Sequence, residues 1–210
     1  MLYTVTTSTG TKEVTVYWPK DVKRLGVMTS GGFDSALLLW MWAQYPIPKG
    51  CSLVAVATDR GLGAKEFAQG IVTKINELLG TSIELIVLPV GENTRHPQQV
   101  NKPANIAMRR DMFDGVISAD TTNPAVTLPG VEPKRVGIEE QFAYSNWQHP
   151  FLHMDKSHTV QLVHDLGLDW IPEMSHTCTE TADIRCGKCW QCSERAWGFS
   201  TTGLSDLGRF

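Results

Sequence analysis

A glycine-rich hexapeptide, Ser-Gly-Gly-Phe-Asp-Ser at residues 30–35, constrains the fold of this chain more than any other feature. It follows a short apolar run at residues 25–28 and precedes a longer one at residues 36–43. Glycine readily adopts a positive φ, so this loop can turn sharply and direct its N–H groups toward one point. The order of these segments therefore predicts a buried strand, a tight loop and a helix whose N-terminus faces the loop.

The composition of the loop suits a bound anion. A helix N-terminus carries a partial positive charge, and Ser30 and Ser35 add hydroxyl groups to the N–H groups of Gly31 and Gly32. Such a nest of donors binds phosphate or pyrophosphate. The loop has neither the Gly-Lys-Ser/Thr of kinases and GTPases nor the Gly-x-Gly-x-x-Gly of dinucleotide enzymes. The structural alternative is an ordinary strand-to-helix turn capped by one Ser or Asp.

Hydrophobic patterns along the rest of the chain alternate between short apolar runs and longer amphipathic stretches. Strands separated by helices of this length form a parallel sheet with helices on both faces, so we expect a Rossmann-like α/β fold. The expected strands lie at residues 25–28, 53–58, 83–90 and 115–118, and the expected helices at residues 36–43, 64–79, 105–113, 138–147, 157–166 and 193–197.

Three segments stand outside this alternation. Residues 2–18 alternate Thr with Val, Tyr and Leu around a Gly-bearing turn, which predicts an N-terminal β-hairpin. Residues 93–103 and 120–136 are rich in Asn, Pro and Thr. We interpret both as functional loops, because long loops in a compact domain usually carry function.

Four of the five cysteines lie between residues 178 and 192 in the pattern C-x7-C-x2-C-x2-C. Two residues between thiolates let a tight turn present both sulfurs to one ion, and four sulfurs complete a tetrahedral zinc site. A closed site leaves no position for substrate, so the predicted role of the metal is structural. An iron–sulfur cluster uses similar spacing and is the chemical alternative. The predicted ligands are Cys178, Cys186, Cys189 and Cys192.

Length and charge narrow the class of protein. The 210 residues suit a domain over residues 1–170 that includes the hairpin and a metal-binding subdomain over residues 171–210. The net charge of -3 argues against binding to a nucleic-acid backbone. No apolar run approaches the roughly 20 residues of a membrane span. The N-terminus also lacks the basic start and apolar stretch of a signal peptide, so we expect a cytoplasmic protein.

Together, the loop and the cysteine motif resemble a known family. Ser-Gly-Gly-Phe-Asp-Ser resembles the PP-loop of the N-type ATP pyrophosphatases, which cleave ATP between its α and β phosphates. The sequence CGKCWQCSERAWGF resembles the C-terminal motif of the 7-cyano-7-deazaguanine synthase family of queuosine precursor biosynthesis. Motifs at four or five points between residues 25 and 199 carry the resemblance. It implies an adenine nucleotide alpha hydrolase-like fold, bound ATP, Mg²⁺ and Zn²⁺, and a homodimer.

The resemblance also implies roles for individual residues. Asp34 would help to hold magnesium and act in catalysis with Lys156, which would face the phosphates; the alternative for Lys156 is a solvated surface lysine. Asp59 would lie near the nucleotide; its alternatives are a helix cap or a surface charge. The implied nucleotide-binding loop is Ser30, Gly31, Gly32, Phe33, Asp34 and Ser35, and the implied substrate-binding residues are Asn105, Asp120 and Arg195. For Arg195 the alternative is an ion pair near the metal site.

The implied reaction is an ATP-dependent amination by ammonia. A carboxylate, 7-carboxy-7-deazaguanine in the family, is adenylated and converted to 7-cyano-7-deazaguanine with release of AMP and pyrophosphate. Residues 121–125, Thr-Thr-Asn-Pro-Ala, depart from the family's Tyr-Pro-Asp-Cys-type loop, and residues 59–63 depart from its Asp-Tyr-Gly-Gln. These departures bear on the substrate more than on the nucleotide. The alternatives are tRNA thiolation, action on another carboxylate or a protein C-terminus, and a non-catalytic nucleotide sensor.

Overall fold

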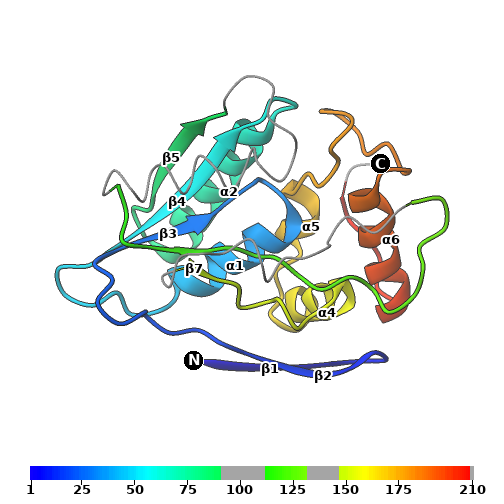
Figure 1. Ribbon diagram of the computed structural model, residues 1–210, viewed down its shortest axis with the longest axis horizontal. Coiled ribbons are helices and arrows are strands. Elements are labelled where there is room, and N and C mark those ends of the chain that lie inside the picture. Colours follow the sequence, from blue (N-terminus) through cyan, green and yellow to red (C-terminus); the bar gives the residue numbers. More distant parts are fainter. Residues whose placement is uncertain (91–111, 132–146, 209–210) are drawn as a thin grey trace.

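The computed structural model describes residues 1–90, 112–131 and 147–208. A five-stranded parallel sheet with the order β5-β4-β3-β6-β7 forms their centre (Figure 1). The parallel α/β class expected from the sequence is therefore confirmed. The strands are β3 (Arg24–Met28), β4 (Ser52–Asp59), β5 (Glu84–Pro89), β6 (Gly115–Ile117) and β7 (Trp147–Gln148).

The strand order reverses at β3. From β3 the chain moves outward to β4 and β5, then returns to the other side of β3 for β6 and β7. Val27 of β3 pairs with Ala55 of β4 and with Ile117 of β6, so the carboxyl ends of β3 and β6 are neighbours. In open parallel sheets, ligands bind outside the carboxyl ends of the strands at such a reversal. The topology therefore predicts a ligand site between the loop after β3 and the segment after β6.

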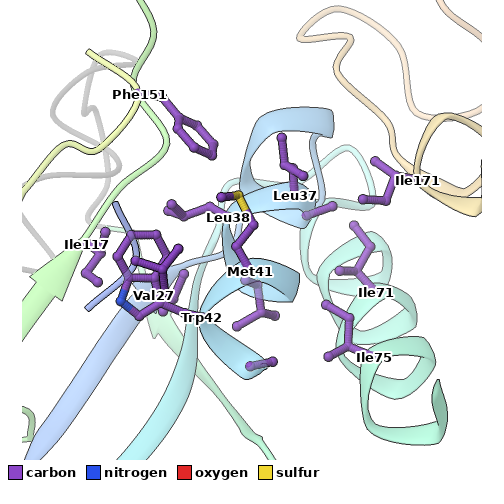
Figure 2. Packing of buried hydrophobic residues seen from close by; sticks show 14 of the residues in the cluster. Val27, Leu37, Leu38, Met41, Trp42, Ile71, Ile75, Ile117, Phe151 and Ile171 are labelled. Carbon is purple, nitrogen blue, oxygen red and sulfur yellow. The ribbon is translucent and has the colours of Figure 1, made fainter. Parts of the chain in front are cut away.

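Helices of the described ranges pack on one face of the sheet (Figures 1 and 2). Helix α1 contacts β3 and the helices α2, α4 and α5, so nine of its eleven residues are buried. Figure 2 shows Val27 of β3 beside Trp42 of α1, with Ile71 and Ile75 of α2 across the same core. These helices are α1 (Phe33–Ala43), α2 (Ala64–Leu79), α4 (Lys156–Asp165) and α5 (Trp170–Met174).

A second apolar cluster lies on the opposite face of the sheet. Met28, Val54 and Val56 alternate with the residues of the first core, as expected for strands buried on both faces. Phe113 and Trp147 also belong to this cluster. The helices expected at residues 105–113 and 138–147 fall mostly outside the described residues. Where they overlap, the expectation is wrong: residues 112 and 113 are not helical, and Trp147 pairs with Val116 in a two-residue strand too short to give a periodic signal.

Two further elements complete the described fold. The hairpin of β1 (Leu2–Thr7) and β2 (Gly10–Thr15) is antiparallel, as expected, and lies against α4 (Figure 1). Helix α6 (Trp190–Thr202) packs on α4 and is longer than the predicted residues 193–197. It ends at Gly203, which adopts a left-handed φ of 70°. Among the described helices, none combines the length and the apolar character that crossing a membrane requires.

Candidate nucleotide site and metal centre

The glycine loop lies between β3 and α1, at the reversal of the sheet. Gly31 has a φ of 79°, and a Cβ there would lie 2.6 Å from the Cβ of Phe67 and 3.0 Å from the backbone N of Ala68. Gly31 therefore allows both the turn and the close packing of the loop on α2. Gly32 is the N-cap of α1, and no described side chain caps this helix. The first-turn N–H groups of α1 thus lack the side-chain acceptor that a helix usually has there.

Hydrogen bonds between the two serines hold the loop in shape. The backbone N–H of Ser30 donates to Oγ of Ser35 over 3.2 Å, and Oγ of Ser35 donates to the carbonyl of Gly32 over 3.0 Å. The N–H of Gly32 donates to Oγ of Ser30 over 3.3 Å. The loop is therefore preorganised by its own side chains.

Phe33 contributes to packing rather than to the loop surface. Its ring is fully buried and meets Phe199 of α6 edge-on, with ring centroids 5.8 Å apart. The guanidinium carbon of Arg195 lies 5.3 Å from the same ring centroid. Of the implied nucleotide-binding loop, Phe33 can therefore offer a ligand only its backbone N–H.

Asp34 and Lys156, the two residues expected to carry catalysis, contact each other although 122 positions separate them. Nζ of Lys156 donates to Oδ2 of Asp34, and Oγ1 of Thr159 donates to Oδ1 of Asp34 over 2.8 Å. The Lys156 side chain is only 4 % exposed, so the alternative of a solvated surface lysine is wrong. Its position at the start of α4 brings a point cation beside the N-terminus of α1.

Helix α6 lies against Lys156. A Cβ on Gly198 would lie 2.5 Å from Cγ of Lys156, so this glycine lets α6 pack directly on the lysine stem. One turn earlier, Oε2 of Glu194 lies 3.9 Å from Nζ of Lys156, and this carboxylate is buried. The sequence gives no sign of Glu194, because a glutamate in a helix is ordinarily exposed. Only the packing of α6 on α4 reveals it.

Arg195 does not face the nucleotide loop as a substrate-binding residue, and this expectation is corrected. Its side chain is fully buried, and all five N–H groups have acceptors within the protein. Two bonds go to the carboxylate of Asp206 over 2.9 and 2.8 Å; the others reach the carbonyl and hydroxyl of Ser175 and the carbonyl of Pro172. No donor remains for a phosphate. The alternative, an ion pair near the cysteines, describes what is seen.

The Arg195–Asp206 pair is a buried, charged anchor. Burial raises the pKa of Asp206, but the hydrogen bonds and charge of Arg195 outweigh burial and hold that pKa below its ordinary value. Burial also lowers the pKa of Arg195, against the opposing effect of Asp206. Arg185 donates a further hydrogen bond to Asp206. The anchor ties α6 to the segment that follows it.

Asp120 lies after β6, across the reversal from the glycine loop. Its Oδ2 accepts a hydrogen bond from Oγ of Ser118 over 2.6 Å and lies 2.9 Å from Nδ1 of His149. Nε1 of Trp147 donates to the same serine oxygen over 2.9 Å. Ser118 and His149 were not singled out by the sequence, because they come together only where β6 and β7 end side by side. Asp120 is thus placed at the edge where the topology predicts a ligand.

Asp59 and Asn105 are the other two residues for which the family resemblance implies a role. Asp59 ends β4 at the same edge of the sheet, but its Oδ2 pairs with Nζ of Lys65 over 3.2 Å and both side chains are largely exposed. The hydrogen bond and charge of Asp59 raise the pKa of Lys65. The surface-charge alternative fits this arrangement. Asn105 and the loop at residues 93–103 lie outside the described residues.

The four C-terminal cysteines converge as predicted. All four Sγ atoms lie within 4.8 Å of one another. The four thiolates are therefore placed to bind one metal centre, either a zinc ion or an iron–sulfur cluster. The N–H of Cys189 donates to Sγ of Cys186 over 3.3 Å, and the N–H of Glu180 donates to Sγ of Cys178 over 3.4 Å. Such outer bonds are typical of metal-binding thiolates.

The metal centre adjoins the nucleotide loop through two connections. The N–H of His176, two residues before Cys178, donates to the carbonyl of Gly31 over 2.9 Å. The His176 ring also stacks on Phe67, with centroids 4.7 Å apart, and its Nε2 lies 2.7 Å from the carbonyl of Thr181. Helix α6 begins at the cysteines and carries Glu194 to Lys156. The segments around the cysteines therefore help to shape the nucleotide site.

The reversed parallel sheet, the glycine loop and the cysteine cluster define an α/β domain with a PP-loop-like sequence motif and four C-terminal cysteines placed to bind a metal. The family described as "Queuosine biosynthesis protein QueC" matches residues 136–203, which include Lys156 and the four cysteines. The match confirms the expected family resemblance for this QueC-like segment, which is less than half of the chain. No curated protein matches the chain.

A solved structure of the U34-tRNA thiolase NcsA from Methanococcus maripaludis, with its [4Fe-4S] cluster, is also similar. It shares 14% sequence identity with a TM-score of 0.36, over 87% of this chain and 57% of the thiolase chain. This chain therefore spans less than two thirds of the length of the thiolase.

Proposed function

We propose that the chain is an ATP-dependent ligase that adenylates a carboxylate and aminates it with ammonia. The proposed substrate is 7-carboxy-7-deazaguanine, and the proposed products are 7-cyano-7-deazaguanine, AMP and pyrophosphate. The observation that carries the proposal is the contact between Asp34 of the glycine loop and Lys156 of the QueC-like segment. Two distant parts of the chain thus supply an acid and a cation at the reversal of a parallel sheet.

The residues around the loop fit the triphosphate of ATP. The uncapped N–H groups of α1 and the hydroxyls of Ser30 and Ser35 would donate to phosphate oxygens. Magnesium, when bound, would neutralise charge on those oxygens, and Asp34 is the carboxylate proposed to hold it. Lys156 would then exchange its contact with Asp34 for one with a phosphate. A flexible, buried lysine side chain beside the loop suits this exchange, because its Nζ can act as a point cation and has a short distance to move.

In the proposed reaction, a carboxylate oxygen of the substrate attacks the α-phosphorus and the bond to pyrophosphate breaks. Ammonia then attacks the carbonyl carbon, AMP leaves and a proton is released, which gives an amide. Activation of the amide oxygen by a second ATP, followed by loss of AMP and a proton, would give the nitrile. The protein's contribution to each transfer is positioning and charge neutralisation.

Asp120 is the proposed contact for the deazapurine. A carboxylate accepts hydrogen bonds from ring and amino N–H groups, and this one is 39% exposed at the same edge of the sheet as the glycine loop. Asn105 is a second proposed contact. The four-cysteine centre is proposed to hold zinc in a structural role. The net charge of -3 favours a small acid over tRNA as the substrate.

The test is a single reaction containing Mg·ATP, ammonium and 7-carboxy-7-deazaguanine, followed by mass spectrometry and pyrophosphate release. Formation of the nitrile supports the proposal. ATP turnover without conversion of this acid would remove the deazaguanine assignment but keep the pyrophosphatase chemistry. ATP turnover that needs tRNA and a sulfur donor would support thiolation instead. Absence of ATP binding, with Asp34→Ala identical to wild type, would overturn the enzyme class.

A further inference from the structure

The N-terminal hairpin contacts the first turn of α4, the helix that begins with Lys156 (Figure 1). Oγ of Ser157 lies 3.2 Å from Oγ1 of Thr7 and 3.1 Å from Oγ1 of Thr9. Nε2 of His158 lies 3.2 Å from the carbonyl of Gly10. The turn of the hairpin therefore meets the two residues that follow Lys156.

Asp155 fixes the same helix turn from the other direction. Its Oδ1 accepts hydrogen bonds from the N–H and the hydroxyl of Ser157, over 3.0 and 2.6 Å, and lies 2.8 Å from Nδ1 of His158. The side chains of Asp155, Ser157 and His158 are all buried. Lys156 lies between these fixed residues, so the direction of its side chain depends on them.

His158 links the two sides of this network. One ring nitrogen faces the carboxylate of Asp155 and the other faces the carbonyl of Gly10. The backbone N–H of Asp155 donates to the same Nδ1 over 3.3 Å, the reciprocal bond of a capping box, so the ring closes this turn of α4 while it contacts the hairpin. Asp155 is the charged group that contacts the ring from α4, and the hairpin presents a backbone carbonyl.

We propose that the β1–β2 hairpin is part of the nucleotide site and that His158 is a positioning residue through which it aligns Lys156 with the glycine loop. The proposal rests on the function proposed above for Lys156. Its physical basis is that a shift of about 1 Å in a group that contacts the reacting atoms can cost on the order of a hundredfold in rate. A two-stranded hairpin is marginally stable alone, so its docking on α4 is also what keeps it folded.

The test measures Mg·ATP affinity by calorimetry for the full chain and for His158→Gln, with His164→Gln as the matched control. His164 is an exposed histidine near the other end of α4. At pH 6.5 we expect His158→Gln to weaken binding by about tenfold or more and the control to change it by less than about twofold. In a Lys156→Met background, His158→Gln should add less than about a twofold loss.

Two results would overturn the positioning role: unchanged affinity in His158→Gln, or a full loss that persists without Lys156. If His158→Gln fails to fold by circular dichroism, Thr7→Val with Thr9→Val replaces it, because both hydroxyls lie outside the hydrophobic core. We expect this pair to weaken binding by roughly threefold while Thr7→Ser with Thr9→Ser binds like wild type; equal binding by both pairs overturns the proposal. A wild-type chain that binds no Mg·ATP would overturn the proposed function as well.

Discussion

Lys156 lies between two carboxylates, those of Asp34 and Glu194, with 4 % of its side chain exposed. A buried ammonium group stays charged only when acceptors replace its water, and these two carboxylates supply them. Each of these two carboxylates in turn faces the positive charge of Lys156. Chemistry and stability are therefore linked at this one side chain.

We expect Lys156→Met to abolish ATP turnover and to destabilise the fold by about 3–5 kcal/mol, because it removes the cation that faces the buried carboxylate of Glu194 and the partly buried carboxylate of Asp34. Urea unfolding measures the stability. Adding Glu194→Gln to Lys156→Met should restore part of the lost stability but none of the turnover. A double variant no more stable than Lys156→Met would show that Glu194 does not depend on the lysine.

Asp155 gives the site a defined response to acid. Burial raises the pKa of Asp155, but hydrogen bonds from His158 and Ser157 outweigh burial and lower it to about 2 from an ordinary 3.8. Because the folded pKa lies below the unfolded one, the stabilisation is complete above about pH 4 and disappears as the pH falls through 2. We expect Asp155→Asn to cost about 2 kcal/mol at pH 7 and to unfold with less dependence on pH between 4 and 2. Urea midpoints measured across that range check the prediction.

At the scale of elements, the loop between β3 and α1 depends on its contact with α2. Gly31→Ala would combine a strained φ with a Cβ 2.6 Å from Phe67, whereas Gly50 has nearly the same φ, 80°, and nothing within 4 Å. Gly50→Ala is thus a matched control for backbone strain alone. We expect Gly31→Ala to lose at least about 1–3 kcal/mol more stability than Gly50→Ala, and to weaken Mg·ATP binding as well. Equal effects in thermal unfolding would mean that the contact with α2 is unimportant.

Local patterns predicted the elements that carry their own signal. Helix α2 matches its expected residues 64–79 because one apolar stripe runs its length and Gly80 ends it with a left-handed φ of 64°. Strand β7 has only two residues, and α5 only five, so neither gives a period to read. Helix α6 extends past its predicted end at residue 197. Glycine is a poor helix former, so the sequence predicts an end before Gly198. In the fold this glycine lies inside the helix, where it lets α6 pack on Lys156.

The residues of the candidate site divide in the same way, into those that a local motif predicts and those that only the fold brings together. The glycine loop and the cysteine cluster were predictable, because each is a local spacing with a chemical meaning. Glu194, His149 and His158 were not, since their partners are brought by other elements and no spacing links them in the sequence. Arg195 was misassigned for the same reason: its partner Asp206 lies in an irregular segment that carries no motif. Pairing across the fold decides which charged residues meet a ligand.

At the scale of the whole molecule, the metal centre and the nucleotide site share two connections, the His176–Gly31 hydrogen bond and helix α6. We expect removal of the metal by a chelator to weaken Mg·ATP binding, because α6 and the segment before Cys178 would lose their common anchor. Cys186→Ser should reproduce this effect in calorimetry. Cys51→Ser, outside the cluster, is the control and should bind like wild type. Metal-free protein that binds Mg·ATP normally would show that the two sites are independent.

We propose that Asp34 and Lys156 together activate a carboxylate with ATP. The most direct measurement is exchange of labelled pyrophosphate into ATP in the presence of 7-carboxy-7-deazaguanine, without ammonium, because this isolates the adenylation step. We predict exchange that requires both Mg²⁺ and the acid and that is lost in Lys156→Met but kept in His164→Gln. Exchange that continues undiminished in Lys156→Met, or that never occurs in a wild-type protein shown to bind Mg·ATP, would contradict the account.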